Sequence, residues 1–158
     1  MSVSIRKAVL DDLPALLKLS VQARDFHNRL LNNYFANIDP QTERAFLEKA
    51  VQEENKIFLV ALKDEETIGM LSAGLKTLPY LSRSYVCQVD TLCVDENHRR
   101  EGIGRLLISE LKKICADADV DEIDLSVYMG NSEAFSFYES LGFSVKKQEM
   151  RLDLKDKN

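Results

Sequence analysis

The sequence predicts an α/β protein in which a mixed β-sheet is layered against helices. Segments with the alternating or continuous apolar patterns of strands are interspersed with segments of helical periodicity. The early strands follow each other through tight turns, whereas the later ones are separated by helices, which favours a sheet with both antiparallel and parallel pairs. The 158 residues suffice for one hydrophobic core, and no linker or repeat interrupts them, so we expect a single domain spanning residues 1–158.

Composition narrows the class of protein. Hydrophobic residues make up 45% and charged residues 30% of the chain, which is typical of a soluble globular protein. The net charge of −5 disfavours a nucleic-acid partner. No apolar run reaches membrane-spanning length, and the start of the chain is too short and charged for a signal peptide. The spacing of Cys87, Cys93 and Cys115 fits no metal site, and we expect reduced, buried thiols in a cytoplasmic protein.

The first half of the chain begins with a half-buried strand, predicted by the alternation in residues 2–8. Residues 11–26 predict a helix with Asp11 or Asp12 as its N-cap, and residues 39–55 predict a second helix. The apolar stripe of the first helix is expected to consist of Leu13, Leu16, Leu17 and Val21. The inner face of the second is expected to include Ala45, Phe46, Lys49 and Ala50.

The remaining elements continue the alternation. In chain order we expect a buried strand (56–63), a turn and a returning strand (67–77), a β-rich run (84–96), a helix (102–116), a strand (122–128), a helix (131–141) that Gly142 ends as a C-terminal cap, and a last alternating strand (143–154).

A pair of glycines, Gly102 and Gly104, lies where the fourth strand leads into a helix. Free N–H groups and the helix dipole favour an anion there, typically phosphate, and neighbouring arginines add charge. The loop lacks the lysine of a P-loop, and Leu107 stands where a dinucleotide fingerprint needs its third glycine. A loop that needs positive φ angles, with solvated arginines, explains the glycines equally well.

Two motifs resemble the GCN5-related N-acetyltransferases, the GNAT superfamily. Arg99-x-x-Gly102-x-Gly104, after a strand that ends in a valine, is similar to the family's acetyl-coenzyme A signature. The stretch NSEAFSFYESLGF resembles a later family segment, through Asn131, Ala134, Phe137, Tyr138, Leu141, Gly142 and Phe143. The likeness covers about residues 86–143, and the first half of the chain agrees in element order only.

The resemblance implies a mixed, mostly antiparallel twisted sheet of about six or seven strands, flanked by about four helices, with a splayed parallel pair at its centre. It implies that acetyl-CoA is the acetyl donor and that loop amides hold its pyrophosphate. The matching positions are Arg99, Arg100, Glu101, Gly102, Ile103, Gly104 and Arg105. It further implies a bulge in the preceding strand, past which the main chain pairs with the pantetheine arm at Leu92, Cys93 and Val94.

The resemblance also implies the catalytic groups. Asn131 would bond the pantetheine arm, although its residue type already suits an N-cap. Tyr138 would protonate the departing thiolate, where spacing alone is also that of a core tyrosine. Asp90 would take a proton from the amine nucleophile, unless a water chain does so or Asp90 is merely solvated. Transfer would be direct, with a backbone N–H near Val94 stabilising the oxyanion and no acyl-cysteine.

The acceptor is left open by the sequence. The family's acceptor pockets correspond here to residues 24–40 and 75–85, and candidate lining residues are His27, Tyr34, Phe35, Tyr80 and Tyr128. We expect an N-acetyltransferase for a primary amine, with a small molecule favoured over a protein N-terminus or lysine. A non-catalytic acyl-CoA sensor is the alternative of another class. A homodimer is compatible with the family, and neither nucleic acid nor membrane is an expected partner.

Overall fold

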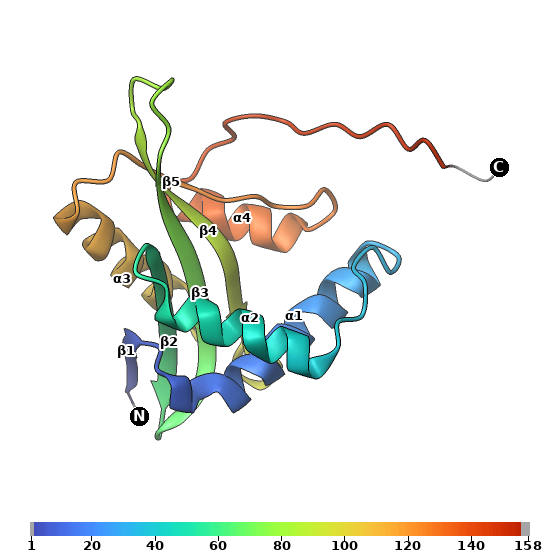
Figure 1. The fold of residues 1–158 in the computed structure, drawn as a ribbon, viewed down its shortest axis with the longest axis vertical. Coiled ribbons are helices and arrows are strands. Elements are labelled where there is room, and N and C mark those ends of the chain that lie inside the picture. Colours follow the sequence, from blue (N-terminus) through green and yellow to red (C-terminus); the bar gives the residue numbers. More distant parts are fainter. Residues whose placement is uncertain (1, 156–158) are drawn as a thin grey trace. The chain divides into compact units, whose positions relative to one another are not determined.

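The structure is a computed structural model that describes residues 2–155. These residues form two compact units, Met1–Ser126 and Val127–Asn158. The first unit holds one mixed sheet (Figure 1) whose strand order follows the chain. Its strands within the described residues are β1 (Val3–Lys7), β2 (Lys56–Lys63), β3 (Glu66–Thr77), β4 (Tyr85–Val94) and β5 (Glu122–Asp124). Neighbours are antiparallel except for the parallel pair β4–β5, which makes the predicted mixed sheet a confirmed feature.

Helices cover both faces of this sheet (Figure 1). On one face α1 (Leu13–Leu30) and α2 (Pro40–Gln52) pack, and on the other α3 (Ile103–Asp117) does. The core beneath α1 consists of Leu13, Leu16, Leu19, Phe58, Val60, Met70 and Cys93. On the α3 face Gly69 lets the helix approach closely, since a Cβ there would lie 3.1 Å from Ile103 Cγ2.

Two predictions about helix faces are correct only in part. On α1 the buried stripe runs through Leu13, Leu16 and Leu19, while Val21 is 40% exposed. On α2 the predicted inner residues Ala45, Phe46 and Lys49 are exposed, Phe46 by 63%. Of the predicted residues only Ala50 lies on the side of α2 that meets the core, together with Leu47 and Val51.

The reason for the α2 error is a buried carboxylate. Glu43 lies one turn before Leu47 on the inner side, where polar residues are not expected. Its oxygens accept two hydrogen bonds from Arg24 at 2.7 and 3.1 Å and one from Ser20 at 2.6 Å. Burial alone would raise the pKa of Glu43, but these partners on α1 outweigh it and lower the pKa.

Asp12 stands at the N-cap position of α1, as predicted, but caps differently. Its carboxylate accepts two hydrogen bonds from Arg6, at 2.7 and 2.9 Å, and one from the Val9 N–H at 2.8 Å. Asp12 therefore joins β1 to the chain segment that leads into α1, a short 3-10 turn (Leu10–Asp12).

The second unit contains α4 (Ser132–Ser140), capped as predicted at both ends. The Asn131 side chain accepts from the Ala134 N–H at 3.3 Å. Gly142 has φ +95°, and the Phe143 N–H donates to Tyr138 O, as expected of a C-terminal glycine cap. No helix within residues 2–155 is both long and apolar enough to cross a membrane.

The predicted last strand, residues 143–154, is wrong for the described chain, which is extended but unpaired there (Figure 1). Its alternation changes phase: Val145 is apolar on one parity, whereas Met150, Leu152 and Leu154 are apolar on the other. Alternation supplies a strand's pattern but not its partner. The strand expected over 122–128 is likewise shorter, at Glu122–Asp124. The described sheet thus has five strands, fewer than expected, with the parallel pair at its edge rather than its centre.

Asp95 anchors the segment that follows β4. It is 4% exposed and accepts from the Asn97 N–H at 3.0 Å and from Gln22 Nε2 at 3.2 Å, while Lys18 Nζ lies 3.0 Å away. Burial alone would raise the pKa of Asp95, but these partners outweigh it and lower the pKa to about 2.

We therefore predict that Asp95 stabilises the fold in a pH-dependent way. Because its folded pKa lies below the ordinary value of about 3.9, the unfolded chain binds more protons between these values, and stability rises with pH there. The contribution, about 2 kcal/mol, is complete above roughly pH 5 and is lost as pH falls through 4 towards 2. Urea unfolding should show Asp95→Asn less stable than wild type at pH 7, with the gap narrowing below pH 4. Asp11→Asn, an exposed carboxylate, is the control, and a gap that stays constant down to pH 2 would contradict the prediction.

Candidate functional site

The central irregularity of β4 is a β-bulge at Asp90. Thr91 pairs with Ser72 and Val89 pairs with Ala73, so Asp90 is one extra residue opposite β3. β4 pairs with β5 only through residues 86–88. Past the bulge, the β5-side edge of β4 has no strand partner within the described residues. The expected bulge is therefore confirmed, whereas the splay of the parallel pair remains a prediction.

The main chain of Leu92 and Val94 points to this open edge. The Asp95 N–H donates to Ile68 O at 2.8 Å, so Asp95 faces β3. Successive residues of an antiparallel ladder face alternate sides, so Cys93 also faces β3. Leu92 and Val94 then present their N–H and C=O groups to the open edge, where an extended ligand arm can pair with them as an added strand.

The loop after β4 ends in an exposed helix N-terminus. A 3-10 turn (Glu96–His98) is followed by Arg100 at φ +64° and Gly102 at φ +81°, and α3 begins at Ile103. Gly102 is the N-cap and has no side chain to accept from the first N–H groups, which also lack acceptors within the helix. These N–H groups and the helix dipole favour an anion. Gly104 has helical geometry, so its conformation does not require glycine.

The charges of this loop are tied to neighbouring elements. Glu101 Oε2 accepts from Lys63 Nζ of β2 at 2.9 Å, and Lys63 lowers the pKa of Glu101. The Arg99 guanidinium lies 5.4 Å from the centroid of the Phe26 ring on α1, a cation–π contact. The loop is thus held from two sides while its helix N-terminus stays open.

Asp90 is not a lone carboxylate. Its Oδ2 accepts from Lys56 Nζ of β2 at 2.8 Å, and its side chain is 40% exposed. Receiving a proton at that oxygen would require this ion pair to open. The role of Asp90 as a base remains a prediction.

The second unit carries the other two predicted residues. The Asn131 side chain caps α4, and its role toward a ligand remains a prediction. Tyr138 packs against Phe137 and Phe143, with ring centroids 5.2 and 5.6 Å away. Burial raises the pKa of Tyr138 to about 12, so its hydroxyl keeps its proton throughout the physiological pH range.

The three cysteines are buried free thiols, as predicted. Cys93, the one beside the open edge, donates to Leu19 O on α1 at 3.4 Å. Burial raises its pKa to about 11, so a reactive thiolate is scarce at neutral pH. Within residues 2–155 no cluster of three or more His, Cys, Asp or Glu side chains is placed to hold a metal ion.

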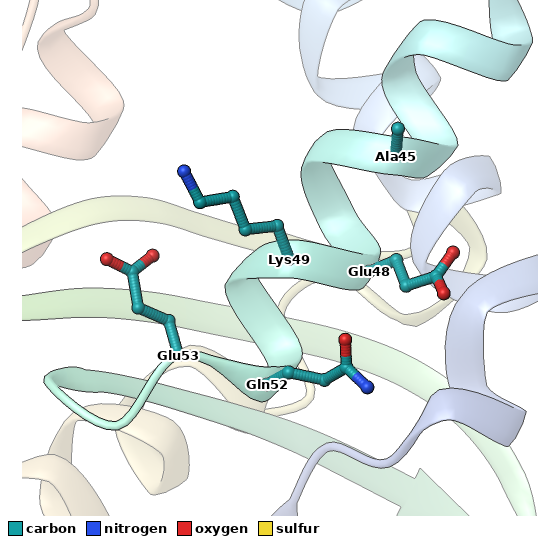
Figure 2. Close-up of a pocket in the computed structure, with 5 residues that line it drawn as sticks. All are labelled: Ala45, Glu48, Lys49, Gln52 and Glu53. Atoms are coloured by element: carbon teal, nitrogen blue, oxygen red, sulfur yellow. The ribbon is translucent and has the colours of Figure 1, made fainter.

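The predicted acceptor segment after α1 is ordered by its own contacts. Asn28 holds Phe35 by both main-chain groups, at 2.7 and 3.0 Å. The rings of His27 and Tyr34 lie edge-on to Phe35, 5.9 and 5.3 Å away. Tyr80, by contrast, is 78% exposed on its loop. The shallow hollow in Figure 2 is a different feature, lined from one stretch only, by Ala45, Glu48, Lys49, Gln52 and Glu53.

The first unit therefore brings together Asp90, the Leu92–Val94 edge and the Arg99–Arg105 loop along one strand and the helix after it. Sequence reasoning missed the residues that hold them, namely Lys56, Lys63, Phe26, Lys18 and Gln22. Each lies far along the chain from its partner, and no motif contains them.

Comparison with known proteins decides the family. The model of the acetyltransferase (GNAT) family matches residues 23–143. The chain belongs to this family. It is an acyltransferase, and GNAT enzymes generally use acetyl-CoA as their donor. The resemblance drawn from the two motifs is thereby confirmed.

A solved structure is similar in fold, and two sequence relatives are named for different acceptors. The crystal structure of the F44R mutant of the BH1408 protein from Bacillus halodurans is similar, with a TM-score of 0.88 and 32% identity, covering 96% of this chain and 99% of that one. The L-amino acid N-acetyltransferase AaaT of Escherichia coli is 25% identical over 145 residues, 91% of this chain and 84% of that protein. An N-alpha-acetyltransferase of Sulfurisphaera tokodaii is 29% identical over 151 residues, covering 90% and 81%.

We predict that replacing Gly102 mainly lowers stability, whereas replacing Gly104 mainly weakens acetyl-CoA binding. Gly102→Ala forces a side chain into φ +81° and should cost about 1 kcal/mol of stability, although the space around it is open. Gly104→Leu keeps helical geometry and should leave stability nearly unchanged, but it should weaken acetyl-CoA binding about 10-fold by obstructing the helix N-terminus. Urea unfolding and calorimetry measure the two effects, and unchanged binding in Gly104→Leu would contradict the assignment.

Proposed function

We propose that this GNAT enzyme transfers the acetyl group of acetyl-CoA directly to a primary amine of a small molecule. One observation carries the proposal: β4 is bulged at Asp90, has an open edge at Leu92–Val94 and leads into the uncapped N-terminus of α3. An extended arm that ends in a diphosphate matches this series of main-chain donors and acceptors. Acetyl-CoA has both parts.

Donor binding would be mainly a main-chain function. N–H groups between Arg99 and Arg105 receive the pyrophosphate oxygens, and the arginines add positive charge. The Leu92 and Val94 main chain pairs with the pantetheine arm, and Asn131 adds a side-chain bond. Because these donors are fixed by the bulge and the helix, little reorganisation is needed on binding.

In the reaction the amine nitrogen attacks the thioester carbonyl carbon. The acceptor ammonium first loses one proton to Asp90 or to water. As the C–N bond forms and the C–S bond breaks, the nitrogen loses a second proton, which replaces through solvent the proton that Tyr138 gives up. The Val94 N–H, directed at the open edge, stabilises the oxyanion. Tyr138 donates a proton to the departing sulfur. Free coenzyme A, the acetylated amine and one proton released to solvent complete the balance.

The buried state of Cys93 supports direct transfer. An acyl-enzyme would need a thiolate with access to the thioester, whereas Cys93 is 6% exposed and bonded to α1.

The acceptor class rests on weaker support. AaaT is named for amino acids and the S. tokodaii relative for protein N-termini, so relatives include both kinds. AaaT covers 91% of this chain and the S. tokodaii relative 90%, so coverage does not choose between the two kinds. We favour the small molecule because Asp90 is paired with Lys56, which places two opposite charges beside the open edge. An acceptor screen that measures thiol release decides between them, with amines, amino acids and peptides as candidate acceptors. If calorimetry shows no acetyl-CoA binding, the proposal fails; binding without thiol release to any acceptor would favour a sensor.

Tyr138→Phe should separate chemistry from binding. Losing the hydroxyl removes the proton donor and should lower kcat about 100-fold, whereas acetyl-CoA affinity should change less than about 2-fold. Stopped-flow or steady-state thiol assays and calorimetry provide the two numbers. Full activity in this variant would remove Tyr138 from the mechanism.

Asp90→Asn tests the base. If Asp90 receives the amine proton, the acidic limb of the kcat/KM profile should shift, because that limb reports the essential base of the free enzyme. The profile is measured from pH 5 to 10 with one acceptor. A lowered rate with an unshifted profile would assign the proton to a water chain instead.

A further inference from the structure

The ion pair between Lys56 and Asp90 lies where the acceptor amine must approach. Asp90 is the bulged residue, and Leu92 follows two residues later, roughly 7 Å along the strand. Lys56 is on the sheet face that carries Phe58 and Val60, since residues two apart share a face. This is the face covered by α1 and α2, and α1 also contacts β4.

Lys56 reaches Asp90 by crossing a whole strand. Lys56 begins β2 and pairs with Gly74 of β3, and Asp90 lies beyond it on β4. A Cβ at Gly74 would lie 3.5 Å from Lys56 Nζ and 3.9 Å from its Cδ and Cε. The aliphatic part of the Lys56 side chain therefore packs over Gly74, and its ammonium group reaches Asp90 in the bulge. Lys56 and Asp90 are 27% and 40% exposed, so both remain accessible to a ligand.

We propose that this pair opens to clamp the zwitterion of an α-amino acid, with Asp90 holding the ammonium group and Lys56 the carboxylate. The inference rests on the proposed function, and it identifies the acceptor class. An α-amino acid carries its ammonium and carboxylate groups on the same carbon. When the 2.8 Å Lys56–Asp90 pair opens, the ammonium group pairs with Asp90 and the carboxylate pairs with Lys56. Four alternating charges result, and none is left unpaired.

Other amines fit this pair less well. A simple amine could take Asp90 only by displacing Lys56, which leaves two positive groups side by side at a partly desolvated position. A carboxamide keeps the amine but offers Lys56 no charge. Loss of one charge-assisted hydrogen bond corresponds to about 10-fold or more in kcat/KM.

The test compares L-amino acids with their own carboxamides as acceptors, by thiol release and by the mass of the product. Wild type should prefer the carboxylate form of its best amino acid about 10-fold or more. Lys56→Gln should lose this preference, because KM for the amino acid should rise relative to KM for its carboxamide. Lys56→Glu should reverse the preference towards diamines. Lys113→Gln, which breaks the exposed Lys113–Glu110 pair on α3, should retain it.

Two results overturn the clamp: equal rates on amino acid and carboxamide in wild type, or a preference that persists in Lys56→Gln. The wild-type comparison needs no variant to fold. Thiol release to amines without any advantage of the carboxylate overturns the clamp alone and leaves the acetyltransfer proposal standing. Absence of acetyl-CoA binding overturns both.

Discussion

One extra residue in β4 is the constraint on which the site depends. Before the bulge Gln88 shares the α1 face of the sheet with Gly74, and after it Thr91 and Cys93 take that face opposite Ser72 and Met70. Without Asp90 as an insertion, every side chain from Thr91 to Val94 would change faces. The bulge thus buries Cys93 beneath α1 and directs the main chain of Leu92 and Val94 to the edge that β5 leaves open beyond Gln88.

Much of this fold follows from local sequence pattern. The strands up to Val94, the four helices and both caps of α4 were predictable because propensity, periodicity and cap chemistry all act over a few residues. The pattern failed where a distant partner decides the outcome. The inner side of α2 depends on Arg24 neutralising Glu43, and a strand at 143–154 depends on a partner that alternation cannot provide.

The candidate site divides in the same way. Its main-chain parts, the bulge and the helix N-terminus, were predictable because the sequence contains the glycine motif of a known family. Its ion pairs do not, because Lys56 lies 34 residues from Asp90 and Lys63 lies 38 residues from Glu101. In the sequence, Lys56 and Lys63 look no different from lysines whose side chains are simply solvated. Only the register between β2, β3 and β4 brings them to the site.

Lysines such as Lys56 and Lys63 offset part of the negative charge of this chain near the candidate site. The chain has a net charge of −5, the proposed donor is a polyanion, and β4 and the loop after it contain carboxylates of their own. Three of these are each met by a lysine from another element: Asp90 by Lys56, Asp95 by Lys18, Glu101 by Lys63. Removing one of these lysines would leave its carboxylate partner without an opposing charge. Lys63 contacts the loop after β4 and Lys56 contacts the bulge. Under the proposed function, donor and acceptor binding would therefore depend on separate charges of one strand, β2.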